Sequence, residues 1–390
     1  MPIDPDTALR PWLDALATEL GGPLALYDAH THIGANDPDG FRQTPEQLLA
    51  QLEKAGDARA AVFPMHEPAG YPPANDTALQ VAEASGGRLV AYCRVDPRAG
   101  ALREATRMLD AGACGIKLHP RAERFGLDEP AVADLAALAH DRRVPILIHA
   151  GRGIPALGRH TVELATAYPD AVLILAHAAI SDLAWLWRVL PDHPNVLVDT
   201  AWWSPIDLMA LFLLAPPGNI VWASDSPYGS PVPSAVNGLR CARQAGLDAA
   251  VVREIAGGQM ARVLDGEAPR DLGPAPGPGA ARPLDPVYER IVAHLTATLA
   301  RAFVRADYSE TLALARLACA VGEGTEHSRL CAGVLELLDL FEANLAPPPD
   351  GRPIPLAGRF LLAALTLART PDVALPDRPD APAPAREISG

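Results

Sequence analysis

Hydrophobic and polar positions alternate regularly between about Leu24 and Leu264. Short apolar runs are followed by longer segments in which apolar residues recur at helical spacing, such as TPEQLLAQLEKAG and PAVADLAALAHDRR. Eight apolar runs are present, each almost continuously apolar, as is typical of strands buried on both faces. The runs are LALYDAHTH, RAAVFPMH, RLVAYCRVD, CGIKLHP, VPILIHAG, AVLILAHAA, NVLVDTAWW and NIVWASDSP. This alternation predicts parallel strands joined by crossover helices.

Eight such units in about 240 residues match the size of a (β/α)8 barrel. A doubly wound open sheet is the structural alternative. However, no GxGxxG or GxxxxGK[ST] sequence follows any of the apolar runs, so the usual nucleotide-binding signatures of open sheets are missing. We therefore predict an α/β fold, a (β/α)8 TIM-type barrel over residues 1–265, with a small all-α C-terminal appendage.

The composition changes after residue 265. Six prolines lie between Pro269 and Pro286, which predicts a linker over residues 266–285. Three helical segments are then expected within a domain over residues 286–370, and a flexible tail over 371–390. The helices are indicated by the stripe Val287, Ile291, Leu295, Leu299 and Phe303, by the stripe Leu330, Val334, Leu337, Leu338 and Phe341, and by the segment GRFLLAALTLART. These helices either cover part of the barrel or mediate homo-oligomerisation or binding of a partner protein.

Composition and charge exclude several classes of protein. With 49% hydrophobic and 21% charged residues, the chain is typical of a globular protein, and its net charge of −14 disfavours nucleic acid as a partner. The longest apolar stretch, Leu208 to Ala215, is too short to span a membrane, and the N-terminal sequence lacks a secretory pattern. Five scattered cysteines suggest neither a disulfide framework nor a thiolate zinc site. We expect a cytoplasmic protein that acts on a small molecule.

Three polar side chains end the first apolar run. Asp28, His30 and His32 are spaced i, i+2 and i+4, so on a strand they lie on one face, which would be the barrel interior. Two imidazoles side by side at a strand end can bind one metal ion. As a purely structural feature, they would be polar groups buried without an obvious partner. The sequence therefore favours a metal site here.

Further polar residues stand where later apolar runs end. His149, His177 and Asp225 end the fifth, sixth and eighth runs, and Lys117 lies in GIKLHP of the fourth. The intervals from Lys117 are 32, 28 and 48 residues, each one or two strand–helix repeats. A single histidine at a strand end is usually a satisfied core residue. Because these residues recur in phase, we expect them to converge at the carboxyl-terminal mouth of the barrel, where such folds keep their active sites.

At these positions the sequence resembles the amidohydrolase superfamily, in particular its branch of amidohydrolase-related hydrolases and decarboxylases. The resemblance covers roughly residues 24–264 and rests on the Asp-x-His-x-His motif and the later strand-end residues. It implies a divalent metal ion, most often zinc, with manganese as the alternative, and one ion per chain rather than two. The metal ligands it implies are His30, His32, His149 and Asp225.

The same resemblance implies catalytic roles. Asp225 would accept a proton from water activated by the metal. His177 would either bind a second metal or, as we favour, hydrogen-bond the substrate oxygen on which negative charge develops. Lys117 would be a carboxylated bridge between two metals or an unmodified lysine that orients a substrate carboxylate. Asp28 would be a weak ligand or a residue that orients a histidine.

Four other residues are candidates for substrate binding. His66 ends the second run, and His119 follows Lys117 by two residues, although a proline after His119 makes a structural role at least equally expected. Trp202 and Trp203 follow the seventh run and could wall an apolar pocket. Alternatively, at least one of these tryptophans packs against the neighbouring helix.

Three functions remain open, and of these we predict the first, with the second as the alternative. The first is a metal-dependent hydrolase of a small-molecule amide, lactam, lactone or ester, which Lys117 and the Asp-x-His-x-His motif favour. The second is a non-oxidative metal-dependent decarboxylase of a carboxylated aromatic or enol substrate, which the tryptophan pair favours. The third is a catalytically silent scaffold, which the intact metal residues disfavour.

Overall fold

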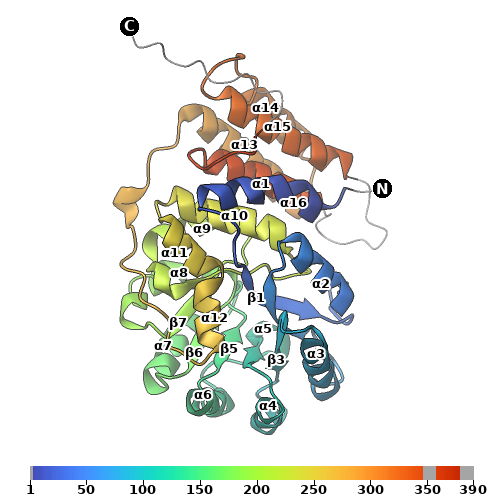
Figure 1. The fold of residues 1–390 in the computed structure, drawn as a ribbon, viewed down its shortest axis with the longest axis vertical. Coiled ribbons are helices and arrows are strands. Elements are labelled where there is room, and N and C mark those ends of the chain that lie inside the picture. The colour runs from blue at the N-terminus through green and yellow to red at the C-terminus, as the bar shows by residue number, and fades with distance from the viewer. Residues whose placement is uncertain (1–2, 346–356, 378–390) are drawn as a thin grey trace.

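The computed structural model describes residues 3–345 and 357–377, and within them the predicted barrel is present (Figure 1). Eight parallel strands pair in the order β1 to β8. Their bounds are β1 Tyr27–Ile33, β2 Arg59–Pro64, β3 Leu89–Arg94, β4 Gly115–Leu118, β5 Pro145–Ile148, β6 Val172–Leu175, β7 Val196–Asp199 and β8 Ile220–Val221. Each strand coincides with one of the eight apolar runs, with β1 extending one residue beyond its run, which confirms the (β/α)8 fold.

Backbone hydrogen bonds bring the first and last strands together. The N–H of Ala29 donates to the carbonyl of Trp222 at 3.1 Å, and the N–H of His32 donates to the carbonyl of Ser226 at 2.8 Å. These bonds join β1 to the end of β8 and to the segment that follows it. As a result, the two chain segments richest in predicted site residues are neighbours at the mouth.

Helices surround the strands, and many begin with a proline, which suits the first helical position because its missing N–H has no partner there. They are α2 Pro45–Lys54, α3 Pro72–Ala84, α4 Ala101–Asp110, α5 Pro120–Glu123, α6 Pro130–Arg142, α7 Leu157–Ala167, α8 Leu183–Leu186, α9 Pro205–Leu214, α10 Pro231–Gln244, α11 Ala249–Arg253 and α12 Gln259–Leu264. In α2, Thr44 and Gln47 form a capping box, and Leu48 and Leu52 are fully buried. Apolar residues such as Phe63, Leu147 and Leu197 fill the barrel interior.

A helix precedes the barrel that the sequence analysis did not anticipate. Helix α1 spans Pro5–Glu19, with the Asp4 side chain accepting a hydrogen bond from the N–H of Thr7. It buries an apolar stripe and contacts α10 of the barrel. The stripe consists of Leu9, Trp12, Leu13 and Leu16. This helical spacing was a readable signal in the N-terminal sequence.

The three expected C-terminal helices are present as α13 Pro286–Phe303, α15 Ser328–Ala343 and α16 Gly358–Arg369. A fourth helix, α14 Ser309–Ala318, was not among those predicted. Helix α16 contacts α13 and α15, and it also contacts α9 and α10 of the barrel. Figure 1 shows α16 beside α1, between the barrel and the other C-terminal helices. The appendage is therefore packed closely on the barrel. Within the described residues, no helix combines the length and apolarity needed to cross a membrane.

A buried arginine fastens the end of α16 to the barrel. The guanidinium of Arg240 in α10 donates to the side chain and carbonyl of Thr370 at 3.0 and 2.9 Å, and to the carbonyl of Ala374 at 2.6 Å. Burial lowers its pKa to about 10. Residues 371–377, which we assigned to the start of a flexible tail, thus include hydrogen-bonded positions. The remainder of that predicted tail, residues 378–390, lies outside the described residues.

Candidate metal centre and active site

Two histidines and one aspartate form a tight triangle at the barrel mouth. The Nε2 atoms of His30 and His32, both in β1, lie 3.1 Å apart. Each Nε2 atom also lies 3.1 Å from Oδ1 of Asp225, in the loop after β8. Burial lowers the pKa of both imidazoles well below its ordinary value and raises the pKa of the Asp225 carboxyl well above its ordinary value. Three donor atoms therefore face one point.

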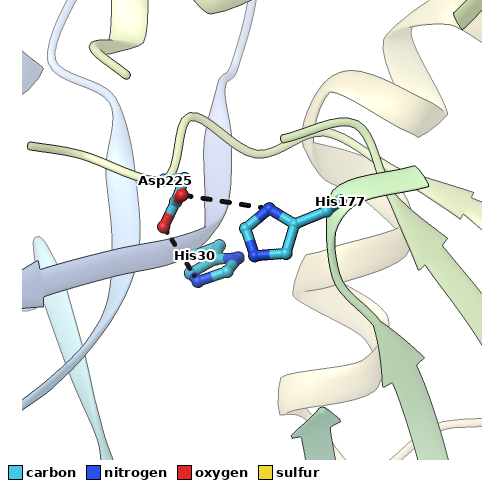
Figure 2. Close-up of side chains that lie close together, drawn as sticks. All are labelled: His30, His177 and Asp225. Atoms are coloured by element: carbon cyan, nitrogen blue, oxygen red, sulfur yellow. Dashed lines mark ion pairs between the residues drawn. The ribbon is translucent and has the colours of Figure 1, made fainter. Parts of the chain in front are cut away.

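His177 lies beside His30 and approaches the other oxygen of the same carboxylate (Figure 2). Its Nδ1 lies 3.9 Å from Oδ2 of Asp225 and 2.9 Å from the carbonyl of Ala201. Because a carbonyl only accepts, Nδ1 carries the proton that it donates to Ala201. Burial lowers the pKa of His177, so the ring is neutral and its Nε2 accepts a hydrogen bond. The donor is Nδ1 of His149, at 2.9 Å.

Asp199, at the end of β7, orients His30. Its Oδ2 lies 2.8 Å from Nδ1 of His30, and its Oδ1 accepts hydrogen bonds from the N–H groups of His177 and Ala201 at 2.8 and 2.9 Å. The carboxylate holds the proton of His30 on Nδ1, which leaves the lone pair of Nε2 directed at the triangle. Asp199 thus connects both histidines.

Asp28 joins β1 to the loop after β8. Its Oδ1 accepts hydrogen bonds from the N–H groups of His30 and Ser224 at 3.1 and 2.9 Å, whereas its Oδ2 is buried without a hydrogen-bond partner. Burial raises its pKa to about 7. Of the two roles left open by the sequence, the bond to His30 corresponds to the second, orientation of a histidine, and the bond to Ser224 also positions the segment that carries Asp225.

Lys117, in β4, is fully buried beneath the triangle. Its Nζ lies 3.3 Å from Nε2 of His30 and 4.8 Å from the centre of the Phe63 ring. Burial lowers its pKa to about 7, although the nearby charge of Asp225 acts in the opposite direction. The side chain is therefore in contact with the predicted metal ligands.

His149 and His119 stack face to face next to the triangle. Their ring centres are 3.9 Å apart with an interplanar angle of 10°. Nδ1 of His119 accepts a hydrogen bond from the N–H of Ala122, so this histidine caps α5, as its structural interpretation expected. Nε2 of His149 is buried without a hydrogen-bond partner. His149 reaches the cluster through its bond to His177.

Backbone conformation at two site positions is unusual. His177, Ala178 and Ala179 have φ values of 58°, 55° and 49°, and Asp225 has a φ of 55°. Non-glycine residues rarely adopt this left-handed conformation, and such positions gather at functional sites when the surrounding structure holds them. The segments carrying His177 and Asp225 are thus held in strained conformations.

The donor set fits a divalent metal ion. Ligand atoms of His30, His177 and Asp225 all lie within 4.8 Å of one another, and the 3.1 Å triangle that includes His32 is tighter still. Zinc–nitrogen distances are about 2.0–2.1 Å, so one ion can contact all three atoms of that triangle. Nitrogen and carboxylate donors suit zinc and manganese alike. The buried Nε2 of His149, which has no hydrogen-bond partner, is a further available donor.

The other predicted substrate contacts lie at the edge of this site. His66 is partly exposed, with Nδ1 3.8 Å from Oε1 of Glu123. The indole N–H of Trp202 donates to Asp207 in α9 at 2.7 Å, and the ring of Trp203 lies 4.9 Å from that of Phe303 in α13. Both tryptophans therefore pack against helices, as the structural alternative anticipated. Their contact with substrate stays a prediction.

Sequence reasoning missed two buried groups at the mouth. Asp199 ends its apolar strand in the same way as Asp225, and this signal was available. Arg94, at the end of β3, forms a buried ion pair with Glu123 at 2.7 Å. The hydroxyl of Tyr71 bonds the same carboxylate. Sequence spacing does not indicate that these three residues meet.

Comparisons with known proteins agree with this fold. The chain resembles the structure of 5-carboxyvanillate decarboxylase from Sphingomonas paucimobilis at 17% identity, with 62% of this chain and 99% of that chain covered and a TM-score of 0.48. It resembles 2,6-dihydroxybenzoate decarboxylase complexed with 2,6-dihydroxybenzoate at 15% identity, with 62% and 98% covered and a TM-score of 0.50. At this level of identity, the likeness concerns the fold alone. No curated protein matches the chain.

The match to a protein family is more extensive. The family model described as amidohydrolase matches residues 27–265, which are more than half of the chain and contain every residue of the triangle. This chain therefore belongs to the amidohydrolase family.

Proposed function

We propose that this protein is a metal-dependent hydrolase that uses water to cleave an amide, lactam, lactone or ester bond in a small molecule. The observation that carries the proposal is the placement of Asp225. Its Oδ1 lies 3.1 Å from Nε2 of both His30 and His32, while its Oδ2 faces His177. One carboxylate thus has an oxygen for a metal and an oxygen for proton transfer. Membership of a metal-dependent enzyme family supports this interpretation.

His30, His32 and Asp225 would hold the ion, with His149 as the fourth ligand. Zinc is the metal that we expect, with manganese as the alternative and one ion per chain. One contact supports the assignment of His30: Asp199 fixes its tautomer, so that the lone pair of Nε2 is available. A bound divalent ion would supply Lewis acidity and would lower the pKa of water in contact with it.

The protein's own residues would then move the proton. Oδ2 of Asp225 would accept a proton from the attacking water and return it to the leaving group. His177 would stabilise negative charge on the substrate oxygen. Neutral His177 accepts at Nε2 and would donate from that atom only as an imidazolium. Burial lowers the pKa of His177 and opposes that form, whereas the nearby carboxylate of Asp199 favours it. Lys117 would orient a substrate carboxylate or, when carboxylated, bridge two ions.

A decarboxylase uses the same residues and is the alternative. The tryptophan pair, which favoured it, is packed against α9 and α13. The deciding experiment assays the zinc- and manganese-loaded protein with panels of lactones, esters and amides for acid release, and with aromatic carboxylic acids for CO2 release. Acid release that disappears in Asp225→Asn supports the hydrolase. CO2 release without hydrolysis would replace it with the decarboxylase.

A further inference from the structure

We propose that Arg359 of α16 is a positioning residue for Asp225, so that the C-terminal helices form part of the catalytic machinery. The inference rests on the proposed metal site, in which Asp225 is a ligand. It concerns the part of the chain beyond the family match, which ends at residue 265. It gives the appendage a role within its own chain, in place of the oligomer or partner contact that the sequence left open.

Arg359 holds the loop that follows β8. Its Nη2 donates to the carbonyl of Pro227 at 3.1 Å and to the carbonyl of Gly229 at 2.8 Å. Both acceptors lie within four residues of Asp225. A guanidinium presents its donors in a rigid plane, so two bonds to one loop restrict the position of that loop.

A short hydrogen-bond chain connects this contact to Asp225. The N–H of Gly229 donates to the carbonyl of Asp225 at 3.1 Å, while the carbonyl of Gly229 accepts from Arg359. The loop is folded so tightly that a side chain at Gly229 would clash with the carbonyl oxygen of Ser224. Because the left-handed backbone of Asp225 is costly, it requires such contacts to persist.

Helix α1 holds the other end of the same segment. Oδ1 of Asp6, which is 1% exposed, accepts a hydrogen bond from the N–H of Val232 in the first turn of α10 at 3.1 Å. Burial raises the pKa of Asp6, and the charge of Arg359 acts against that increase. Asp6 and Arg359 therefore lie close together, and both bind the segment between β8 and α10 from outside the barrel.

Helix α16 also reaches the loop after β7 by a second, independent route. The Thr366 hydroxyl lies 2.7 Å from Oδ1 of Asn237, and Nδ2 of Asn237 donates to the carbonyls of Trp202 and Trp203 at 3.3 and 3.4 Å. Ala201, which precedes Trp202, supplies the carbonyl that accepts from Nδ1 of His177 and so fixes the tautomer of that histidine. Helix α16 thus contacts the loop after β8 directly and the loop after β7 through Asn237.

The test compares Arg359→Gln with the matched control Arg329→Gln in the full chain. Arg329, in α15, also donates to two backbone carbonyls, those of Leu375 and Pro376, but on the exposed surface of the appendage. Two quantities are measured: hydrogen–deuterium exchange of the peptide covering residues 224–232 without metal, and zinc affinity by competition with a chromophoric chelator. We expect Arg359→Gln to speed exchange severalfold and to weaken zinc binding about tenfold. Arg329→Gln should match the wild type.

Two outcomes overturn the proposal. The first is unchanged exchange in residues 224–232 of Arg359→Gln. The second is faster exchange with unchanged zinc affinity, because the contacts of Arg359 would then not influence the position of Asp225. If the wild type binds no zinc, the proposed function fails, and the exchange measurement alone still decides whether Arg359 holds the loop. Arg359→Lys keeps the charge near Asp6 and a hydrogen-bond donor, and should restore part of the zinc affinity. This variant also serves if Arg359→Gln does not fold.

Discussion

Nδ1 of His30 lies 2.8 Å from Oδ2 of Asp199, across the barrel mouth from β1 to β7. The other oxygen of Asp199 accepts hydrogen bonds from the backbone N–H groups of His177 and Ala201. A single carboxylate therefore sets the tautomer of one predicted metal ligand and fixes the backbone of the histidine opposite. Both effects depend on its negative charge and its two acceptor oxygens.

Replacing Asp199 with asparagine should weaken metal binding by about 10–100-fold, because an amide neither favours the required His30 tautomer nor accepts as strongly from the two N–H groups. Zinc affinity measured by chelator competition checks this. Asp192→Asn, at an exposed position outside the site, is the control. Wild-type affinity in Asp199→Asn would show that His30 does not need this partner.

Metal content should distinguish a one-metal site from a two-metal site. Elemental analysis of protein purified without chelator should give about one ion per chain, fewer in Asp225→Asn and the same number in Lys117→Ala, since nitrogen and carboxylate donors of the triangle suffice for one ion. About two ions per chain, falling when Lys117 is lost, would instead indicate a carboxylated lysine bridge. Absence of metal from the wild type would refute the proposed mechanism.

Metal binding should release a proton from the Asp225 carboxyl. Burial raises the pKa of Asp225 well above its ordinary value and lowers the pKa values of His30 and His32. In the metal-free protein, the proton that competes with the metal is therefore on the aspartate, and metal affinity falls as the pH falls below the pKa of Asp225. Calorimetry in two buffers of different ionisation enthalpy measures the released proton. In Asp225→Asn this release should disappear, and its persistence would assign the proton to another group.

Arg240 should be essential for docking of the C-terminal helices. Arg240→Met retains an unbranched apolar side chain but leaves the buried carbonyls near Thr370 without donors, which should cost about 3–5 kcal/mol of unfolding free energy. Urea unfolding followed by circular dichroism measures the loss. The exposed Arg329→Met is the control and should change the unfolding free energy by less than about 1 kcal/mol. Equal unfolding midpoints for both variants would mean that the hydrogen bonds of Arg240 contribute little to the unfolding free energy.

A chain that ends at Leu264 should be poorly soluble. Without α16, the apolar faces of α9 and α10 that it contacts would be open to water, and aggregation should follow. Size-exclusion chromatography of this fragment beside the full chain measures the effect. A soluble monomer with the wild-type far-ultraviolet spectrum would show that the barrel is stable without the appendage.

The sequence predicted the barrel well because buried parallel strands are continuous apolar runs, and this signal is local. The convergence of His30, His32, Lys117, His177 and Asp225 followed from their phase relative to the strands. Asp199 carried the same signal, a polar residue at the end of an apolar run, but was not predicted as a site residue. Helix α1 was missed because its prolines and acids were considered only as evidence against a secretory signal.

Other features depend on contacts between distant segments and were not readable from spacing. His177 approaches Asp225, and His149 forms a hydrogen bond with His177. These contacts depend on side-chain rotamers at the mouth of the barrel, which spacing along the sequence does not determine. The meeting of Arg94 with Glu123 requires loops whose conformations one sequence does not give. Likewise, the amphipathic stripe of the last helix predicts that it is buried, but not that Arg359 reaches the loop after β8.

The packing of α1 against the last helices also bears on how the chain reaches its native state. The N–H of Ile3 donates to Asn344, and the N–H of Ala374 donates to Glu19, so the contacts that fix the first helix join residues more than 300 positions apart. During synthesis, α1 is made well before Asn344 and Ala374. Contacts of such long range form slowly because a large loop must close. The Trp12 side chain of α1, which lies against Gly333 of α15, would therefore remain exposed until α15 has been made.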